Sequence, residues 1–434
     1  MKSISTIFSI FLRMCTNVSS VSSVELGNLS KEDLIYRIRQ LETQVTVLKN
    51  TIAKRSGEKE KKQKPFDFTR YKKRHVLLKF LYLGWDYNGF AGQEEGINTI
   101  ESELFKTLQT TKLIESIKTA NYNRCGRTDS GVSAFSQVIS VDLRSNLLEG
   151  EGVFTPSDYN PVNRANYAKE ELPYCKMLNK NLPKNIKIIA WAPINCNINA
   201  RFDCSSRTYK YYFIKGNLDI KAMEEASKYF IGEHDFRNIC KMNIKNFITN
   251  YKRTILDVSI SPIGSSSEGS YQVYELIVKG YAFLWHQIRY MAAVLFLVGQ
   301  GKEAPQVVKE LLDVEKYPRK PQYAMAIDIP LVFFDCEFGD VNWQYDKENI
   351  EKIIFRLQKF WTEHKIKSTI VKRMIESLES KLNMHVEFNT GSLISGTSSR
   401  TYTPLLKRNF EETLEEKLEK MNKKKKIREA LQGT

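Results

Sequence analysis

The chain has 434 residues, of which 42% are hydrophobic and 11% aromatic, so it can fill the cores of two or three domains and is not a disordered protein. Lysine and arginine number 66 against 50 aspartates and glutamates, a formal net charge of +16. This excess favours a polyanionic partner such as nucleic acid over an acidic metabolite. We predict no membrane span, because the most apolar stretch contains His286, Gln287 and Arg289, which are costly in lipid.

The cysteine and histidine patterns argue against a metal site. Seven cysteines occur without a CxxC pair, and only five histidines are present, so no metal-ligand spacing is found. We therefore expect free thiols in a reducing compartment and no bound metal.

Residues 1–25 are predicted to be a flexible leader. They contain Lys2 and Arg13, many serines and no acidic residue before residue 25, which is typical of an organelle transit peptide. A poorly ordered N-terminus is the alternative. We expect the protein in the cytoplasm, the nucleus or both, with mitochondrial targeting as the alternative. The basic residues 421–429 suit a nuclear localisation signal or a helix with solvated lysines.

Residues 26–53 are predicted to be a coiled-coil-like helix. Apolar residues recur there at alternating spacings of four and three: Leu34, Ile38, Leu41, Val45, Leu48 and Ile52. An amphipathic helix packed on its own domain would have the same pattern. Residues 54–74 are predicted to be a basic linker, which is either solvated or an arm that contacts RNA.

The folded part is predicted to start at His75 and to mix strands with helices. Residues 75–85 have the apolar content of a buried strand, and residues 98–108 the pattern of a helix with Asn98 as its N-cap. QVISVDL (137–143) and RTYKYYF (207–213) alternate as strands do. Two later segments, 351–364 and the tail from Glu411, are predicted to be mainly helical. The order of these strands and helices along the chain predicts an α+β fold with an antiparallel sheet.

A loop near residue 129 brings Arg124, Arg127 and Asp129 together with Gly126 and Gly131. Asp-Ser-Gly is favoured turn chemistry, so Asp129 could simply cap its own backbone. A catalytic carboxylate is the alternative, because an arginine keeps its proton and would hold a neighbouring carboxylate ionised. An ionised carboxylate can act as a nucleophile or as a base.

Two further positions place polar groups on apolar elements. Tyr209 lies on the aromatic face of residues 207–213, either as core packing or as a ring that stacks on a base and a hydroxyl that transfers a proton. Arg289 lies in residues 279–301, which otherwise suit a buried helix. Because an unpaired buried charge is costly, Arg289 needs a carboxylate partner, and Asp129 is the candidate.

Four motifs, in this order and spacing, resemble the TruA-type tRNA pseudouridine synthase family: GRTDSGVSA (126–134), RTYKY (207–211), GEHDF (232–236) and FLWHQIRYMAAVLFLVG (283–299). GVSAFSQVISVDLRS, KPQYAMAIDIPLVFFDC and the late RTYTPLL are similar to the eukaryotic branch that modifies positions 38 and 39 in the tRNA anticodon arm. Ser133 stands where bacterial members carry a histidine, which we interpret as a difference in specificity or packing.

The resemblance implies the pseudouridine synthase fold, with two similar α+β halves, a catalytic half at 75–215 and a second half at 216–340. Their antiparallel sheets would form a central RNA-binding cleft, followed by a mostly helical C-terminal extension at 341–434. It further implies a tRNA pseudouridine synthase that binds the anticodon arm, forms a homodimer, and uses neither a metal nor an organic cofactor.

For the site, the resemblance implies that Asp129 is the catalytic aspartate, Tyr209 the active-site tyrosine and Arg289 the basic residue that pairs with Asp129. RNA contacts are expected from Tyr209 and from three arginines: Arg124, Arg127 and Arg207. Arg127 would help to hold the flipped nucleotide. Asp129 would either attack the sugar carbon or take a proton from the sugar, and the sequence does not separate these routes.

Two other classes of protein stay open. A noncatalytic tRNA-binding or chaperone protein could keep the fold without needing Asp129. An RNA-modifying enzyme with Cys125 as its nucleophile is the second, because two neighbouring arginines would lower the pKa of that thiol.

Overall fold

The computed structural model divides into two compact units, residues 1–66 and 67–434. It describes residue 42 and, further along the chain, residues 66–92, 97–160, 170–242, 249–264, 266–384, 386–394, 401–413, 415–420 and 422–423. The predicted leader, nearly all of the predicted helix at 26–53 and the first part of the basic linker lie outside the described residues.

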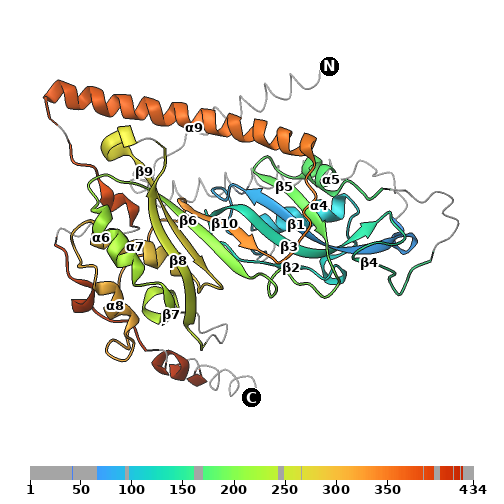
Figure 1. Ribbon diagram of the computed structural model, residues 1–434, viewed down its shortest axis with the longest axis horizontal. Helices are drawn as coiled ribbons and strands as arrows, with labels where there is room; N and C mark the ends of the chain where they lie inside the picture. The colour runs from blue at the N-terminus through green and yellow to red at the C-terminus, as the bar shows by residue number, and fades with distance from the viewer. Residues whose placement is uncertain are drawn as a thin grey trace. The chain divides into compact units, whose positions relative to one another are not determined.

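A ten-stranded sheet runs through the second unit in the order β4-β1-β3-β10-β6-β9-β8-β7, with β2 paired to β3 and β5 paired to β1 (Figure 1). The strands are β1 (Lys72–Tyr82), β2 (Asn123–Arg124), β3 (Ser133–Ser145), β4 (Val153–Phe154), β5 (Ile186–Pro193), β6 (Ser206–Ile214), β7 (Gly232–Asp235), β8 (Lys252–Pro262), β9 (Val273–Gly280) and β10 (Leu331–Glu337). Every strand pair is antiparallel except β3 with β10. The prediction of an α+β fold with an antiparallel sheet is therefore confirmed.

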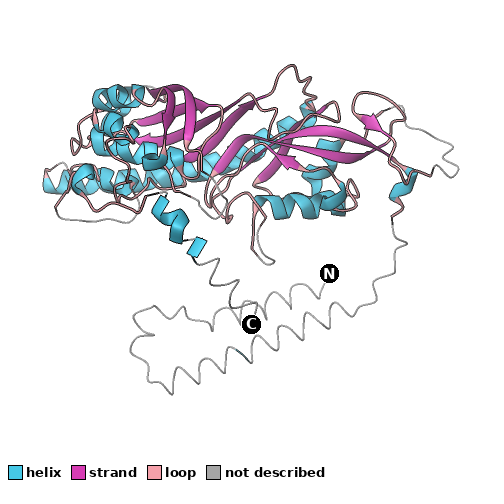
Figure 2. Ribbon diagram, turned by 90° about the horizontal axis from the view of Figure 1, so that it is seen from below, coloured by secondary structure: helices cyan, strands magenta, loops and turns pink. Residues whose placement is uncertain are grey.

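The helices lie beside this sheet (Figure 2). They are α4 (Ile100–Thr110), α5 (Tyr174–Asn181), α6 (Ile220–Lys228), α7 (Gln287–Gly299), α8 (Val307–Leu312) and α9 (Lys347–Leu382). Figure 1 shows α6, α7 and α8 grouped at the end of the sheet that carries β7 and β8, and α5 beside β5. None of the helices in the described part of the chain combines the length and the apolar content needed to cross a membrane.

The alternating pattern of residues 207–213 forms strand β6 as predicted. Tyr209, Tyr211 and Phe213 face the core, and the Phe296 ring of α7 packs edge-on against Tyr211 at 5.6 Å and against Phe213 at 5.3 Å. The alternation in β3 is misleading, however. Ser140 is as completely buried as the apolar residues around it, because β3 is an inner strand of the sheet.

The predicted cap of the first helix is wrong by one residue. Thr99 is the N-cap of α4, and its hydroxyl accepts from the Ser102 N–H at 3.2 Å while the Ser102 hydroxyl accepts from the Thr99 N–H at 3.1 Å. The predicted cap, Asn98, instead directs its side-chain amide to the Asp86 carbonyl. Two adjacent residues can both cap a helix, and only the backbone decides between them.

The parallel pair of β3 and β10 joins the two ends of the sheet. Val332 lies opposite Ser133 across this pair, and Phe333 of β10 lies opposite Tyr209 of β6 on its other edge. Strand β6 also pairs with β9, so the sheet continues across the predicted boundary at residues 215 and 216. The start of β3, where the loop with Asp129 ends, thereby lies next to strands from the later part of the chain.

The helix predicted at 351–364 is confirmed and is longer at both ends, since α9 spans Lys347–Leu382. Its first turns are anchored by the buried side chains of Asn349 and Ile353. Farther along, most of its apolar side chains are exposed. Of the predicted helical tail, residues 415–420 are helical and the last residues lie outside the described part of the chain.

Candidate active site

The loop that carries Asp129 connects β2 to β3 and is held along its length. The Gln137 side chain bonds to Gly126 twice, accepting from its N–H at 3.3 Å and donating to its carbonyl at 3.1 Å. Thr128 follows, and its hydroxyl bonds to the Tyr82 hydroxyl at 2.8 Å. The loop is therefore an anchored part of the core and not a free surface turn.

Close backbone approach fixes the far end of the loop. A Cβ atom on Gly84 would lie 1.9 Å from the Val132 carbonyl oxygen, so only glycine fits there. The Gly84 N–H donates to the Ser133 hydroxyl at 3.0 Å, which supports the packing interpretation of Ser133. Gly131 has φ +78°, and its Cα faces the Asp328 carboxylate.

The Asp129 carboxylate is held by two residues that come just before α7. The indole Nε1 of Trp285 donates to Oδ1 at 3.0 Å, and Nε2 of His286 lies 3.4 Å from Oδ2. The Asp129 side chain is 26% exposed, so a substrate can reach it. The carboxylate thus joins two distant parts of the chain, which argues against the interpretation of Asp129 as a turn residue that caps its own backbone.

The predicted ion pair between Arg289 and Asp129 is wrong. No ion pair joins these two described residues; the Arg289 Nε donates to the Ala326 carbonyl at 2.8 Å, and the Ala326 N–H donates back to the Arg289 carbonyl at 3.1 Å. The physical reason is position on the helix. Arg289 lies inside the first turn of α7, whereas His286 lies at the N-cap, nearer to the loop.

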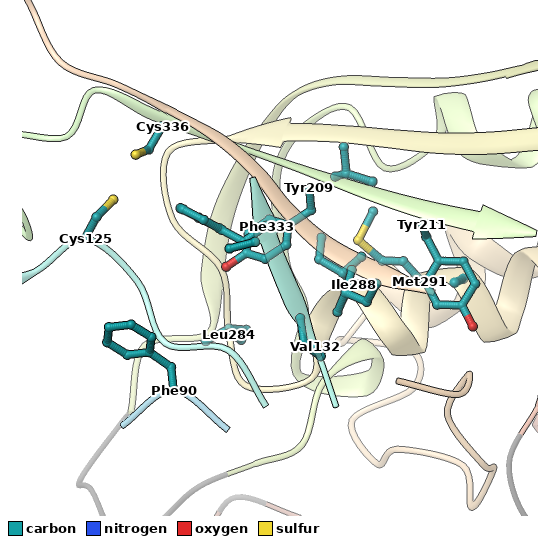
Figure 3. Packing of buried hydrophobic residues seen from close by; sticks show 14 of the residues in the cluster. Phe90, Cys125, Val132, Tyr209, Tyr211, Leu284, Ile288, Met291, Phe333 and Cys336 are labelled. Atoms are coloured by element: carbon teal, nitrogen blue, oxygen red, sulfur yellow. The ribbon is translucent and has the colours of Figure 1, made fainter. Parts of the chain in front are cut away.

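Tyr209 lies beside the Asp129 loop, in an aromatic cluster. Its ring packs edge-on against Phe283 at 5.1 Å and against Phe333 at 5.0 Å, and Figure 3 shows the rings of Tyr209 and Phe333 lying together. A Cβ atom on Gly126 would be 3.9 Å from the Tyr209 hydroxyl. Burial, together with nearby negative charge that includes Asp129, raises the pKa of Tyr209, so its phenol keeps its proton near neutral pH.

The two arginines of the loop have different surroundings. Arg124 pairs with the buried carboxylate of Glu101, which also accepts from the Tyr122 hydroxyl and the Gly92 N–H. Arg127 is exposed and has no hydrogen bond or ion pair within the described part of the chain. Burial of part of its stem and the neighbouring charges of Arg124 and Arg201 lower the pKa of Arg127. An anion placed beside Arg127 would relieve this repulsion.

Arg207 binds main-chain carbonyls of three segments around the site. Its guanidinium donates to Cys125 in the Asp129 loop at 3.1 Å, to Arg201 at 2.8 Å and to Tyr281 at 2.5 Å. Arg207 therefore ties together the backbone that surrounds Asp129. Its predicted contact with RNA stays a prediction.

The Cys125 thiol is poorly suited to act as a nucleophile. The residue is 4% exposed, and hydrogen bonding to Cys204 together with burial raises the pKa of Cys125. Figure 3 shows Cys125 and Cys336 directed toward each other. Among the described residues, no group of three or more His, Cys, Asp or Glu side chains is arranged to hold a metal ion.

Trp285 and His286 are absent from the predicted site, although their sequence context contains a signal. Two side chains with ring N–H groups stand directly before a helix whose residues are all buried, and a polar group at such a helix start needs a partner. Sequence alone could not show that the partner is Asp129, because Trp285 and Asp129 lie 156 residues apart in the chain.

The comparisons with known proteins agree with a site that acts on RNA. A family model described as tRNA pseudouridine synthase matches residues 226–339. The tRNA pseudouridine(38/39) synthase of Homo sapiens is 42% identical over 409 residues, which cover 87% of this chain and 84% of that protein. The protein of the same name from Saccharomyces cerevisiae is 41% identical, with 73% of each chain covered.

A more distant relative is the tRNA pseudouridine synthase A of Methanosarcina barkeri, which is 28% identical over 69% of this chain and 98% of its own. Together with the high identity to the human and yeast proteins, these matches show that the chain belongs to the tRNA pseudouridine synthase family. Its predicted resemblance to that family is confirmed.

Proposed function

We propose that this protein isomerises uridine to pseudouridine at positions 38 and 39 of the tRNA anticodon stem-loop. The observation that carries the proposal is the Asp129 carboxylate, held on an anchored loop and contacted by two ring nitrogens from a distant segment. The names of the human and yeast relatives support these two positions. We further propose that the surface around this loop forms the RNA-binding cleft between the two ends of the sheet.

The reaction breaks the bond between uracil N1 and the sugar and forms a bond between uracil C5 and the same sugar carbon. The C5 hydrogen leaves as a proton and N1 gains a proton, so no atom or electron is gained or lost overall. The target base must first leave the stacked RNA arm, which costs a few kcal/mol in other base-flipping enzymes. Asp129 then either attacks the sugar carbon or takes a proton from the sugar as the base departs.

The neighbouring residues suit supporting roles. Tyr209 offers a protonated phenol and an aromatic edge to the displaced uracil. Arg127 is available for a phosphate or for the space left by the flipped base. Arg124 and Arg207 are bound to protein groups, so we propose that they shape the binding surface while Arg289 holds the segment around Ala326.

The test is release of tritium from C5 of uridine in an unmodified tRNA transcript. The full chain is expected to release tritium from a transcript with uridine at positions 38 and 39 and to release none from a transcript with cytidine there. Asp129→Asn should lose at least about a thousandfold in rate, as happens when the central group of a catalytic unit is removed, while still binding tRNA. Full activity of Asp129→Asn would favour another catalytic group. If the wild-type chain binds tRNA but releases no tritium, the noncatalytic tRNA-binding class is favoured.

We also propose that the protein acts as a homodimer, as the family resemblance implies. Helix α9 has an apolar ridge whose residues are spaced four positions apart. Each of its side chains is at least half exposed: Ile366, Ile370, Met374, Leu378 and Leu382. Such ridges pack helix against helix. In an antiparallel pair centred on Met374, Ile370 would face Leu378 of the other copy.

For the compartment, we propose the cytoplasm, the nucleus or both, with mitochondrial import as the alternative. The support comes from composition alone, because the leader lies outside the described residues. Microscopy of the full chain with a fluorescent protein at its C-terminus, with and without residues 1–25, tests it. A mitochondrial signal that depends on these residues would favour import.

A further inference from the structure

The backbone at His286 adopts a conformation that histidine rarely takes. His286 is the N-cap of α7 with φ 62° and ψ 8°, in the left-handed region. The turn is fixed by Gln287, whose N–H donates to the Leu284 carbonyl at 3.1 Å and whose side-chain Oε1 accepts from the Leu284 N–H at 2.8 Å. Strain of this kind persists where a site requires it.

The His286 imidazole is also placed at a cost in hydrogen bonding. Its side chain is 8% exposed, and within the described part of the chain its Nδ1 is buried without a hydrogen-bond partner. A proton on Nδ1 would therefore have no acceptor. Of the two nitrogens, Nε2 is therefore the one that these surroundings favour as the carrier of a ring proton, and it lies 3.4 Å from Asp129 Oδ2.

The two oxygens of Asp129 thus have unequal partners. Oδ2 faces an imidazole that is buried and held by a rigid turn. Oδ1 accepts from Trp285, which is 41% exposed. A substrate can displace an exposed indole far more easily than a buried ring.

We propose that His286 is a positioning residue for the reaction, which holds Asp129 through Oδ2 so that Oδ1 is presented to the sugar of the flipped uridine. This inference rests on the proposed function. Nε2 and Oδ2 lie 3.4 Å apart, which is longer than an ideal hydrogen bond, and contacts in a catalytic site without substrate are often long or poorly aligned and tighten in the complex.

The test is His286→Gly, since glycine adopts φ 62° without strain and leaves a space the size of imidazole. We expect kcat on tRNA to fall at least about tenfold, with KM and the tRNA Kd unchanged, because the variant loses an interaction with Asp129 and none with RNA. Added imidazole should restore part of kcat. Asn383→Gly, at the left-handed C-cap of α9, is the matched control. Its kcat should equal that of wild type and should not change when imidazole is added.

A kcat for His286→Gly within twofold of wild type, or a reduced kcat that imidazole leaves unchanged, would overturn the proposal. If this variant fails to fold, nitrogen NMR of the wild-type chain with labelled histidine carries the test. The His286 signal, assigned by its shift in Asp129→Asn, should have the pattern of a ring protonated on Nε2, and protonation on Nδ1 would overturn the proposal. No tritium release by the wild-type chain would sink the proposed function itself, and activity of Asp129→Asn would remove Asp129 from its catalytic role. An inactive Asp129→Asn with an active His286→Gly would sink only this inference.

Discussion

Trp285 and Asp129 meet at 3.0 Å through a hydrogen bond that spans 156 residues of sequence. The bond brings the segment before α7 against the loop between β2 and β3. Since β3 and β10 form the parallel pair at the middle of the sheet, the carboxylate lies where strands from the earlier and later parts of the chain adjoin. An active site built in this way requires both parts to be folded before Asp129 is held in place.

Gly84 should be intolerant of any side chain. A Cβ atom there would lie 1.9 Å from the Val132 carbonyl oxygen, so Gly84→Ala must push the end of the Asp129 loop away. We expect a loss of about 1–3 kcal/mol in the free energy of unfolding, typical of overpacking, and a fall in kcat. Denaturant unfolding and the tritium-release assay measure the two effects. Gly339→Ala, where no atom lies within 4 Å of the added Cβ, is the control, and an equal response of both variants would contradict the account.

Arg127 should contribute to tRNA binding mainly through phosphate charge. It is exposed and has the cations Arg124 and Arg201 as neighbours, so Arg127→Ala should weaken binding and reduce the slope of log K against log salt by about 1. Filter binding of tRNA over a range of salt concentrations measures this slope. Arg319→Ala, whose guanidinium pairs with Glu416, is the matched control. An unchanged slope for Arg127→Ala would place Arg127 outside the binding surface.

Local patterns in the sequence predicted the elements, and nonlocal geometry decided the site. Strand β6 and helix α7 follow from alternation and from a long apolar run, because these patterns depend on neighbours in sequence. The partner of Asp129 cannot be predicted in this way, because it comes from a distant part of the chain. Arg289 and His286 lie three residues apart, and the charge argument favours the guanidinium. The left-handed backbone at His286 turns the imidazole to the loop instead, and no residue pattern encodes that turn.

The parallel insertion of β10 between β3 and β6 was equally hidden from the sequence. The strand comes after α8, far from both of its partners in the chain, and its register depends on contacts that form only in the folded sheet. The position of the Asp129 loop beside Phe333 follows from this insertion. Asp129 itself could be predicted because its motif is local, whereas the groups that surround it could not.

Arg289 should matter for stability before it matters for chemistry. Its Nε donates to the buried Ala326 carbonyl, and Arg289→Leu would leave that acceptor unsatisfied, which costs about 1–3 kcal/mol. Denaturant unfolding should show this loss, while the exposed Arg319→Leu should change stability by less than about 0.5 kcal/mol. A variant with wild-type stability and tRNA affinity but no activity would instead assign Arg289 a direct catalytic role.

Met374 should lie at the centre of the dimer contact if α9 forms it. Met374→Glu places two like charges face to face across an antiparallel pair of helices, so we expect a shift from dimer to monomer in sedimentation or light scattering. Phe355→Glu is the control, since Phe355 is exposed and lies off the ridge. A dimer that survives Met374→Glu would place the contact elsewhere, and a monomeric wild-type chain would remove the dimer proposal.

His75 should make stability depend on pH with a definite sign. Burial lowers its pKa, but hydrogen bonds to Asp142 and to the Ile198 carbonyl outweigh burial, so the folded pKa is raised above 6.5. A raised pKa contributes stability that is fully present below pH 6.5 and is lost as the pH rises through the folded pKa. Urea unfolding should therefore give a free energy of unfolding that falls as the pH is raised from below 6.5 through the folded pKa of His75. In Asp142→Asn the His75 ring stays buried while the carboxylate is gone, so the fall should shrink or reverse, and an unchanged fall in that variant would show that another group causes it.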